Sequence, residues 1–274
     1  MGATKRVRKR RYKPRRRSRY RKRGGAVGTK HLAILFYGRI SSYEHSLEYI
    51  NSIYKNPRFN CVVFCSLNLK NKSQYITDFC KEFNIADEQI NIEPTEYPAA
   101  YKDNVHNKTF CETPTSCINT YSMYYHQHKA FKLMEGYEKR HSTAFDIVVM
   151  FRPDMNAKDA PNVFPIEETI APNTIYVPRP VGATEIGPNG LTPEECEEQH
   201  GSDFYRNGLT TLAAYGNKEA MKKYTSLIEQ GNPELDHPEV LLFEHVEKMG
   251  LKLHRFDHNI VLNPERKDAK YPTE

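Results

Sequence analysis

Two charged side chains directly follow the most apolar segment of the chain. Residues 147–151, Ile-Val-Val-Met-Phe, have the length and β-branched content of a strand buried on both faces. Arg152, Pro153 and Asp154 come next. Because proline cannot donate to a sheet ladder, the strand is expected to end here, with both charged side chains emerging at its carboxyl end. In open α/β sheets this edge is where ligands bind.

A second candidate binding segment ends the first apolar run of the chain. Residues 31–38 are expected to form a buried strand, and Tyr37, Gly38 and Arg39 stand at its end. The glycine would let a ligand approach the backbone, and Arg39 precedes the amino end of an expected helix, which favours anions. A diphosphate fits such a position. The alternative is that Gly38 only makes the turn and Arg39 is a solvated surface charge.

The elements that must position these residues alternate between strand and helix. This β-α alternation predicts an α/β fold with a mostly parallel central sheet, wound right-handedly, and helices on both faces. Ser41 and Glu44 have capping-box spacing at the start of the first helix. The expected strands are 31–38, 61–67, 90–94, 147–151, 174–180, 209–215 and 251–256, and the expected helices are 41–54, 73–84, 117–140, 217–229 and 238–249.

Composition favours one large domain with a tail. The chain has 274 residues, of which 38% are hydrophobic, so it can bury a full core. No apolar run approaches the roughly 18 residues that span a bilayer, and no signal-peptide pattern opens the sequence. We therefore expect a soluble intracellular protein, whose six cysteines are reduced thiols.

The positive charge is concentrated at the amino terminus. Residues 5–23 hold 14 of the 40 Lys and Arg residues and no acid, so the rest of the chain has 26 basic and 34 acidic residues, a net charge of −8. Such a segment has no apolar face whose burial could offset the entropy lost on ordering, and its like charges repel each other. We expect residues 1–29 to be a disordered polybasic arm with a glycine-containing linker, followed by a folded domain over residues 30–274. Residues 24–30, Gly-Gly-Ala-Val-Gly-Thr-Lys, lack the order of a phosphate-binding loop.

The arm is suited to a polyphosphate partner. Arginine forks pair with phosphate oxygens, and each neutralised phosphate releases counterions, so nucleic acid is the leading expectation for residues 5–23. An anionic membrane surface, a nuclear targeting signal and a solubilising tail remain alternatives.

Five segments together resemble a known family. They are LAILFYGRI, SMYYHQHKAFKLMEGYE, FDIVVMFRPDM, SDFYRNGLTTLAAYGNKEAMKKY and HPEVLLFEHVEKMGLKLHRFD, which lie within residues 31–262. The chain is similar to GT-A-like glycosyltransferases of the type found in large DNA viruses, bacteria and algae. The resemblance implies a Rossmann-like GT-A fold and a nucleoside diphosphate sugar as donor.

The same resemblance implies roles for single residues. The carboxylate of Asp154 would help to bind a divalent cation, Mn²⁺ or Mg²⁺, on the nucleotide diphosphate. Tyr37, Gly38 and Arg39 would lie near the nucleotide. The usual Asp-x-Asp motif reads Arg152-Pro153-Asp154 here, so a cation that can itself neutralise phosphate replaces one carboxylate. Many relatives have Asp-Gln where this chain has Asp203 and Phe204.

Sugar transfer builds negative charge on the departing nucleoside diphosphate, which Arg39, Arg152 or a metal at Asp154 would stabilise. An inverting reaction also needs a carboxylate base near the acceptor hydroxyl. Asp203 is the first candidate for this base, and Asp236 and Glu239 are the next candidates.

Histidines are further candidates for the site. His254 and His258, near the last expected strand, are candidate metal or phosphate contacts, and His258 is taken as a second metal ligand beside Asp154. His126 and His128 project roughly 200° apart on one expected helix and cannot share a metal, so we interpret them as helix-face residues.

Three classes of function stay open. The first is a glycosyltransferase acting on an unknown glycan or protein acceptor. The second is a nucleic-acid-binding or virion-associated structural protein built on an inactive transferase-like domain, and the third is a nucleotidyltransferase or another nucleotide-binding α/β enzyme. If the protein is viral, we expect it in the host cytoplasm or nucleus, or packaged in the virion.

Salt dependence tests the arm. If the arm contacts backbone phosphates alone, affinity for random duplex DNA should fall steeply with salt, with a log-log slope of roughly −5 to −7. The measurement is a salt series of binding for the full chain and for residues 29–274. A slope near zero in the full chain, or full affinity in the shortened one, would contradict this interpretation.

Overall fold

The computed structural model describes residues 29–38, 40, 43–68, 73–97, 114–156, 163–178, 212–230, 238–256 and 260–262. Residues 1–28 of the expected arm lie outside this set. The division of the chain into arm and domain therefore stays a prediction.

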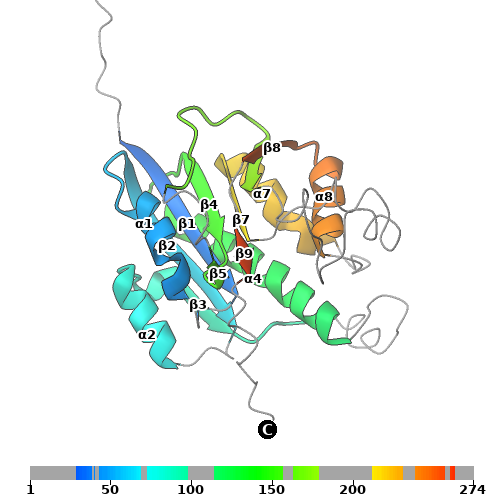
Figure 1. The fold of residues 1–274 in the computed structure, drawn as a ribbon, viewed down its shortest axis with the longest axis horizontal. Coiled ribbons are helices and arrows are strands. Elements are labelled where there is room, and N and C mark those ends of the chain that lie inside the picture. Colours follow the sequence, from blue (N-terminus) through cyan, green and yellow to red (C-terminus); the bar gives the residue numbers. More distant parts are fainter. Residues whose placement is uncertain are drawn as a thin grey trace, which may run out of the picture.

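A mixed seven-stranded sheet of order β3-β2-β1-β4-β7-β6-β8 forms the centre of the structure (Figure 1). β7 runs antiparallel to β4 and β6, whereas the other described pairs in the sheet are parallel. This confirms the expected α/β fold with a mostly parallel sheet; the antiparallel strand was not predicted. The strands are β1 (Lys30–Gly38), β2 (Phe59–Asn68), β3 (Ile90–Glu93), β4 (Ile147–Phe151), β6 (Thr174–Pro178), β7 (Ala213–Gly216) and β8 (Lys252–Phe256), with β5 (Met155–Asn156) and β9 (Val261–Leu262) paired separately.

Helices cover both faces of the sheet, as the sequence predicts. Ile34 and Phe36 of β1 belong to a core shared with α1 and α2, whereas Leu35 and Tyr37 belong to a second core shared with α4, α7 and α8. No described helix is long and apolar enough to cross a membrane. The helices are α1 (Leu47–Tyr54), α2 (Ser73–Glu82), α4 (Pro114–His141), α7 (Lys218–Thr225) and α8 (Pro238–Lys248), with 3₁₀ turns η1 (Tyr43–Ser46), η2 (Asp87–Gln89) and η4 (Ser226–Gln230).

The first helix begins later than the capping-box spacing predicts. Ser41 lies outside the described residues, the chain from Tyr43 to Ser46 forms η1, and α1 starts at Leu47. Ser46 makes no side-chain cap, because its hydroxyl lies 3.0 Å from the carbonyl oxygen of Tyr43 and 2.9 Å from that of Pro153. This buried serine instead links the start of α1 to the segment that follows β4.

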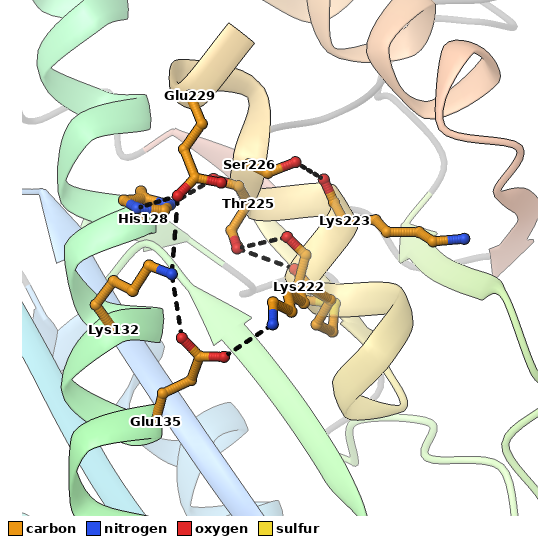
Figure 2. Close-up of polar contacts among 9 residues, drawn as sticks. His128, Lys132, Glu135, Lys222, Lys223, Thr225, Ser226 and Glu229 are labelled. Atoms are coloured by element: carbon orange, nitrogen blue, oxygen red, sulfur yellow. Dashed lines mark hydrogen bonds and ion pairs between the residues drawn. The ribbon is translucent and has the colours of Figure 1, made fainter.

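Charged side chains line the contact between α4 and the α7–η4 segment (Figure 2). Lys132 of α4 lies 3.2 Å from Glu135 and 3.7 Å from Glu229, and Lys222 lies 3.4 Å from Glu135. The Nε2 atom of His128 lies 3.3 Å from Glu229. Partly exposed pairs of this kind each contribute only about 0.2–1 kcal/mol, so the apolar core between α4 and α7 is the main contact of α7.

Replacing Gly216 tests the packing of the antiparallel strand. A Cβ atom at this position would lie 2.8 Å from the carbonyl oxygen of Thr174, which is backbone and cannot move aside easily. We expect Gly216→Ala to lower the free energy of unfolding by about 1–3 kcal/mol, measured by urea denaturation.

Gly136→Ala is the matched control. Its Cβ would meet only the end of the flexible Arg140 side chain, at 3.2 Å, inside helix α4. Because alanine favours a helix interior over glycine by about 0.5–1 kcal/mol, this change should be neutral or stabilising. Equal losses in both variants would contradict the packing argument.

Candidate functional site

The carboxyl ends of β1 and β4 lie side by side in the sheet. Leu35 pairs with Met150 and Phe36 with Phe151, so Tyr37 and Arg152 follow on neighbouring strands. β2 extends the sheet on one side of β1, whereas β4 extends it on the other. This reversal of direction is the topological switch point of the sheet, the position at which α/β proteins bind ligands.

Arg152 and Asp154 form a two-armed ion pair at this edge. The Nε atom of Arg152 donates to Oδ1 of Asp154 at 3.0 Å, and Nη2 donates to Oδ2 at 2.9 Å. The carboxylate is 1% exposed and the arginine side chain 12%. The bidentate geometry fixes the plane of the guanidinium, as the stronger class of charge-assisted hydrogen bond does.

The backbone around the pair is held at several points. The Arg152 amide donates to the carbonyl of Leu212 at 2.8 Å, and the Met155 amide donates to the carbonyl of Arg152 at 3.3 Å. The Ser46 hydroxyl contacts the carbonyl of Pro153. These contacts anchor the turn that carries both charges.

Helix α4 supplies the opposite wall. The Nη1 atom of Arg152 lies 3.8 Å from the sulfur of Met123, and Gln127 lies one helical turn later. Gln127 is 1% exposed, and its Nε2 atom makes no standard hydrogen bond with any residue the structure describes. Its side chain nevertheless lies close enough to Tyr37 to oppose part of the rise that burial causes in the pKa of that phenol.

Tyr37 is the buried phenol of this site. Burial raises the pKa of Tyr37 well above its ordinary value, and the positive charge of Arg152 opposes part of that rise. The side chain therefore stays protonated and can act as a hydrogen-bond donor or acceptor, but not as a base, at neutral pH.

Gly38 ends β1 with a positive φ, the conformation of a turn-making glycine, which was the alternative in the sequence analysis. Its φ is +93°, in the region that side-chain-bearing residues rarely adopt, and a Cβ there would meet no atom within 4 Å. The glycine is thus required by the turn rather than by crowding.

The structure brings together three of the expected site residues, Tyr37, Arg152 and Asp154. Arg39, Asp203, Asp236 and His258 lie outside the described residues, as does the side chain of Glu239 on α8. Their roles, including those of base and metal ligand, stay predictions.

The described side chains do not fit a divalent cation at Asp154. Each of its carboxylate oxygens accepts a hydrogen bond from Arg152, so a cation bound there would lie directly beside the guanidinium charge. Across the described parts of the chain, no group of three or more His, Cys, Asp or Glu residues could hold a metal ion.

A buried polar network lies farther along the same sheet edge. His126 of α4 contacts the Ser66 hydroxyl through Nδ1 at 3.0 Å and the Thr95 hydroxyl through Nε2 at 3.3 Å. Thr95 also contacts Ser122 at 2.6 Å and accepts from Asn68 at 3.1 Å. His126 therefore lies on the buried face of α4, which is consistent with its interpretation as a helix-face residue.

The two helix histidines face different elements. The Nδ1 atom of His128 lies 3.2 Å from the carbonyl oxygen of Thr225, in the α7–η4 segment, whereas His126 faces β2 and the segment after β3. They therefore project apart, as the sequence analysis expected.

Comparisons with known proteins give similarity of structure only. No family model and no curated protein sequence matches this chain. Three similar solved structures are the bifunctional glycosyltransferase WbbM (10% identity, TM-score 0.38, 83% of this chain and 39% of that one), mouse xyloside xylosyltransferase 1 (11%, 0.39, 83% and 85%) and 4-diphosphocytidyl-2C-methyl-D-erythritol synthase from Anaerococcus prevotii (9%, 0.41, 88% and 94%). The chain thus spans well under half of WbbM, and no residue role is transferred from these proteins.

Gln127, Met123 and Ser46 are the site residues that the sequence analysis missed. A helical spacing of four places Met123 and Gln127 on one face of α4. Nothing in the sequence says that this face meets the carboxyl ends of β1 and β4.

The buried network predicts a loss of stability in acid. Burial lowers the pKa of His126 from 6.5 to about 4; the nearby charge of Glu93 opposes this shift and that of Lys129 adds to it. Below pH 6.5 the unfolded chain therefore binds a proton that the folded chain does not. The free energy of unfolding should fall by about 1.4 kcal/mol per pH unit from this group, levelling near pH 4.

Urea denaturation across this pH range checks the expectation. His126→Gln should fall less steeply than the unchanged protein, and His45→Gln, at an exposed position of η1, controls for loss of a histidine as such. Burial also lowers the pKa values of His128 and His245, so part of the slope should remain. Identical slopes in the unchanged protein and His126→Gln would contradict the assignment.

Proposed function

We propose that this chain is a glycosyltransferase that moves a sugar from a nucleoside diphosphate sugar to an acceptor. The observation that carries the proposal is the Arg152–Asp154 pair beside Tyr37 at the switch point of the sheet. An oriented arginine at this edge matches the negative charge of a diphosphate. The sequence resemblance to GT-A-like glycosyltransferases of viral, bacterial and algal type supports the same reaction.

In the proposed reaction the bond between the anomeric carbon and the diphosphate oxygen breaks, and the electron pair leaves with the nucleoside diphosphate. The acceptor hydroxyl forms the new bond and gives up its proton. Arg152 stabilises the charge that develops on the leaving group, and Arg39 would add to it. Asp203 is the proposed base for the acceptor hydroxyl, and Asp236 and Glu239 are the next candidates for this role.

A second candidate function comes from the polybasic arm. The 14 Lys and Arg residues of 5–23 favour a nucleic-acid-binding or virion-associated protein whose transferase-like domain is inactive. Release of nucleoside diphosphate from a sugar nucleotide separates the two candidates, because an inactive domain releases none.

A donor screen tests the proposed function. Purified protein is incubated with a panel of UDP-, GDP-, CDP- and ADP-sugars, with and without Mn²⁺, and the released nucleoside diphosphate is measured. We expect release from at least one donor, and a loss of about 10²- to 10³-fold in Arg152→Ala, because a donor to the developing charge is removed.

Arg58→Ala is the matched control for this loss. Arg58 directly precedes β2, at the amino edge of the same sheet, where its side chain is more than half exposed. It should turn over like the unchanged protein. No release from any donor under either condition would contradict the proposed function.

A further inference from the structure

The carboxylate of Asp154 is committed to a cation that belongs to the protein itself. Each of its two oxygens accepts one hydrogen bond from the Arg152 guanidinium, at 3.0 and 2.9 Å. A metal ion binding to this carboxylate would have to displace the arginine or lie directly beside its positive charge. Both changes are unfavourable at a site from which water is largely excluded.

The exposed fractions of the two side chains also argue against a metal ion at Asp154. The Asp154 side chain is 1% exposed, whereas the Arg152 side chain is 12% exposed. A ligand that approaches from solvent therefore meets the guanidinium before the carboxylate. The carboxylate is placed to orient the arginine, not to reach the ligand.

The turn between the two residues restricts any rearrangement. Pro153 fixes its own φ, and its carbonyl contacts the buried Ser46 hydroxyl at 2.9 Å. The amide of Arg152 is bonded to the carbonyl of Leu212. These contacts tie the backbone that carries both side chains to the start of the first helix and to the sheet.

Helix α4 packs beside the ion pair and carries a buried amide. The Nε2 atom of Gln127 is buried without a standard hydrogen bond among the described residues, and such atoms are rare in folded proteins. Met123, one turn earlier on α4, contacts Nη1 of Arg152. At 1% exposure the Gln127 amide, like the Asp154 carboxylate, is less accessible from solvent than the Arg152 guanidinium, and it lies beside the Tyr37 phenol.

We propose that Asp154 is a positioning residue for Arg152, and that this internal ion pair binds the diphosphate of the ligand without a divalent cation. The inference rests on the proposed function, because it names the charge partner of the donor diphosphate. It replaces the expectation that Asp154 is a metal ligand.

Calorimetric titration of the full chain tests the proposal. UDP, GDP, ADP, CDP and inorganic pyrophosphate are titrated in EDTA and, separately, in Mn²⁺. We expect at least one nucleoside diphosphate to bind in EDTA with nearly the same Kd as in Mn²⁺. Binding that appears only with Mn²⁺ overturns the inference and leaves the proposed function standing, whereas no binding in either buffer overturns both.

Asp154→Asn separates a positioning role from a metal ligand. The variant weakens the two hydrogen bonds that Arg152 donates to this side chain. The affinity for the nucleoside diphosphate should therefore fall by about 10- to 100-fold, and by the same factor in both buffers. A loss confined to Mn²⁺ that more Mn²⁺ restores is the behaviour of a metal ligand and overturns the proposal.

Coupling between the two residues gives a second, independent readout. If Asp154 acts through Arg152, the double variant Arg152→Gln/Asp154→Asn should bind no more weakly than Arg152→Gln alone. Additive losses overturn the positioning role.

Folding of each variant is checked by its circular dichroism spectrum and melting temperature, and Arg58→Gln is the matched arginine control. If Asp154→Asn does not fold, Mn²⁺ binding to the unchanged protein decides the matter. Electron paramagnetic resonance of Mn²⁺ with protein and UDP should then show no more bound ion than UDP alone, and additional bound ion overturns the proposal.

Discussion

The parallel register between β1 and β4 sets the position of the described polar groups of the candidate site. Both strands are buried on both faces, so their polar side chains lie at the strand ends. Leu35 opposite Met150 and Phe36 opposite Phe151 bring Tyr37 next to Arg152. A shift of one residue would turn these side chains to the opposite face, away from α4.

Charge at this edge is balanced inside the protein. A buried ion pair is weak evidence for stability, since desolvation offsets much of its attraction, but it does fix one geometry. Here the cost of burying Asp154 is met by a two-armed contact to Arg152, and the result is an arginine whose plane is set before any ligand arrives. Preorganisation of this kind lowers the entropy lost on binding.

The neighbouring network around His126 differs from the ion pair, because uncharged hydroxyl groups contact the histidine. The hydroxyls of Ser66 and Thr95 contact the histidine without a formal charge, and burial lowers its pKa. The sheet edge thus contains the Arg152–Asp154 ion pair near β1 and β4 and a network of hydroxyl groups around His126 near β2 and β3. Acid should weaken the network around His126, because the unfolded chain gains a proton there that the folded chain resists.

The sequence by itself determined the α/β alternation, the strand burial and the placement of Arg152 and Asp154 at a strand end, because these follow from local apolar runs and from the proline at 153. The antiparallel direction of β7 and the pairing of β1 with β4 depend on contacts between distant segments. Only the tertiary structure decided that Asp154 faces Arg152 and that Met123 and Gln127 of α4 close the site. Side-chain partners across elements depend on packing and desolvation, which no local pattern encodes.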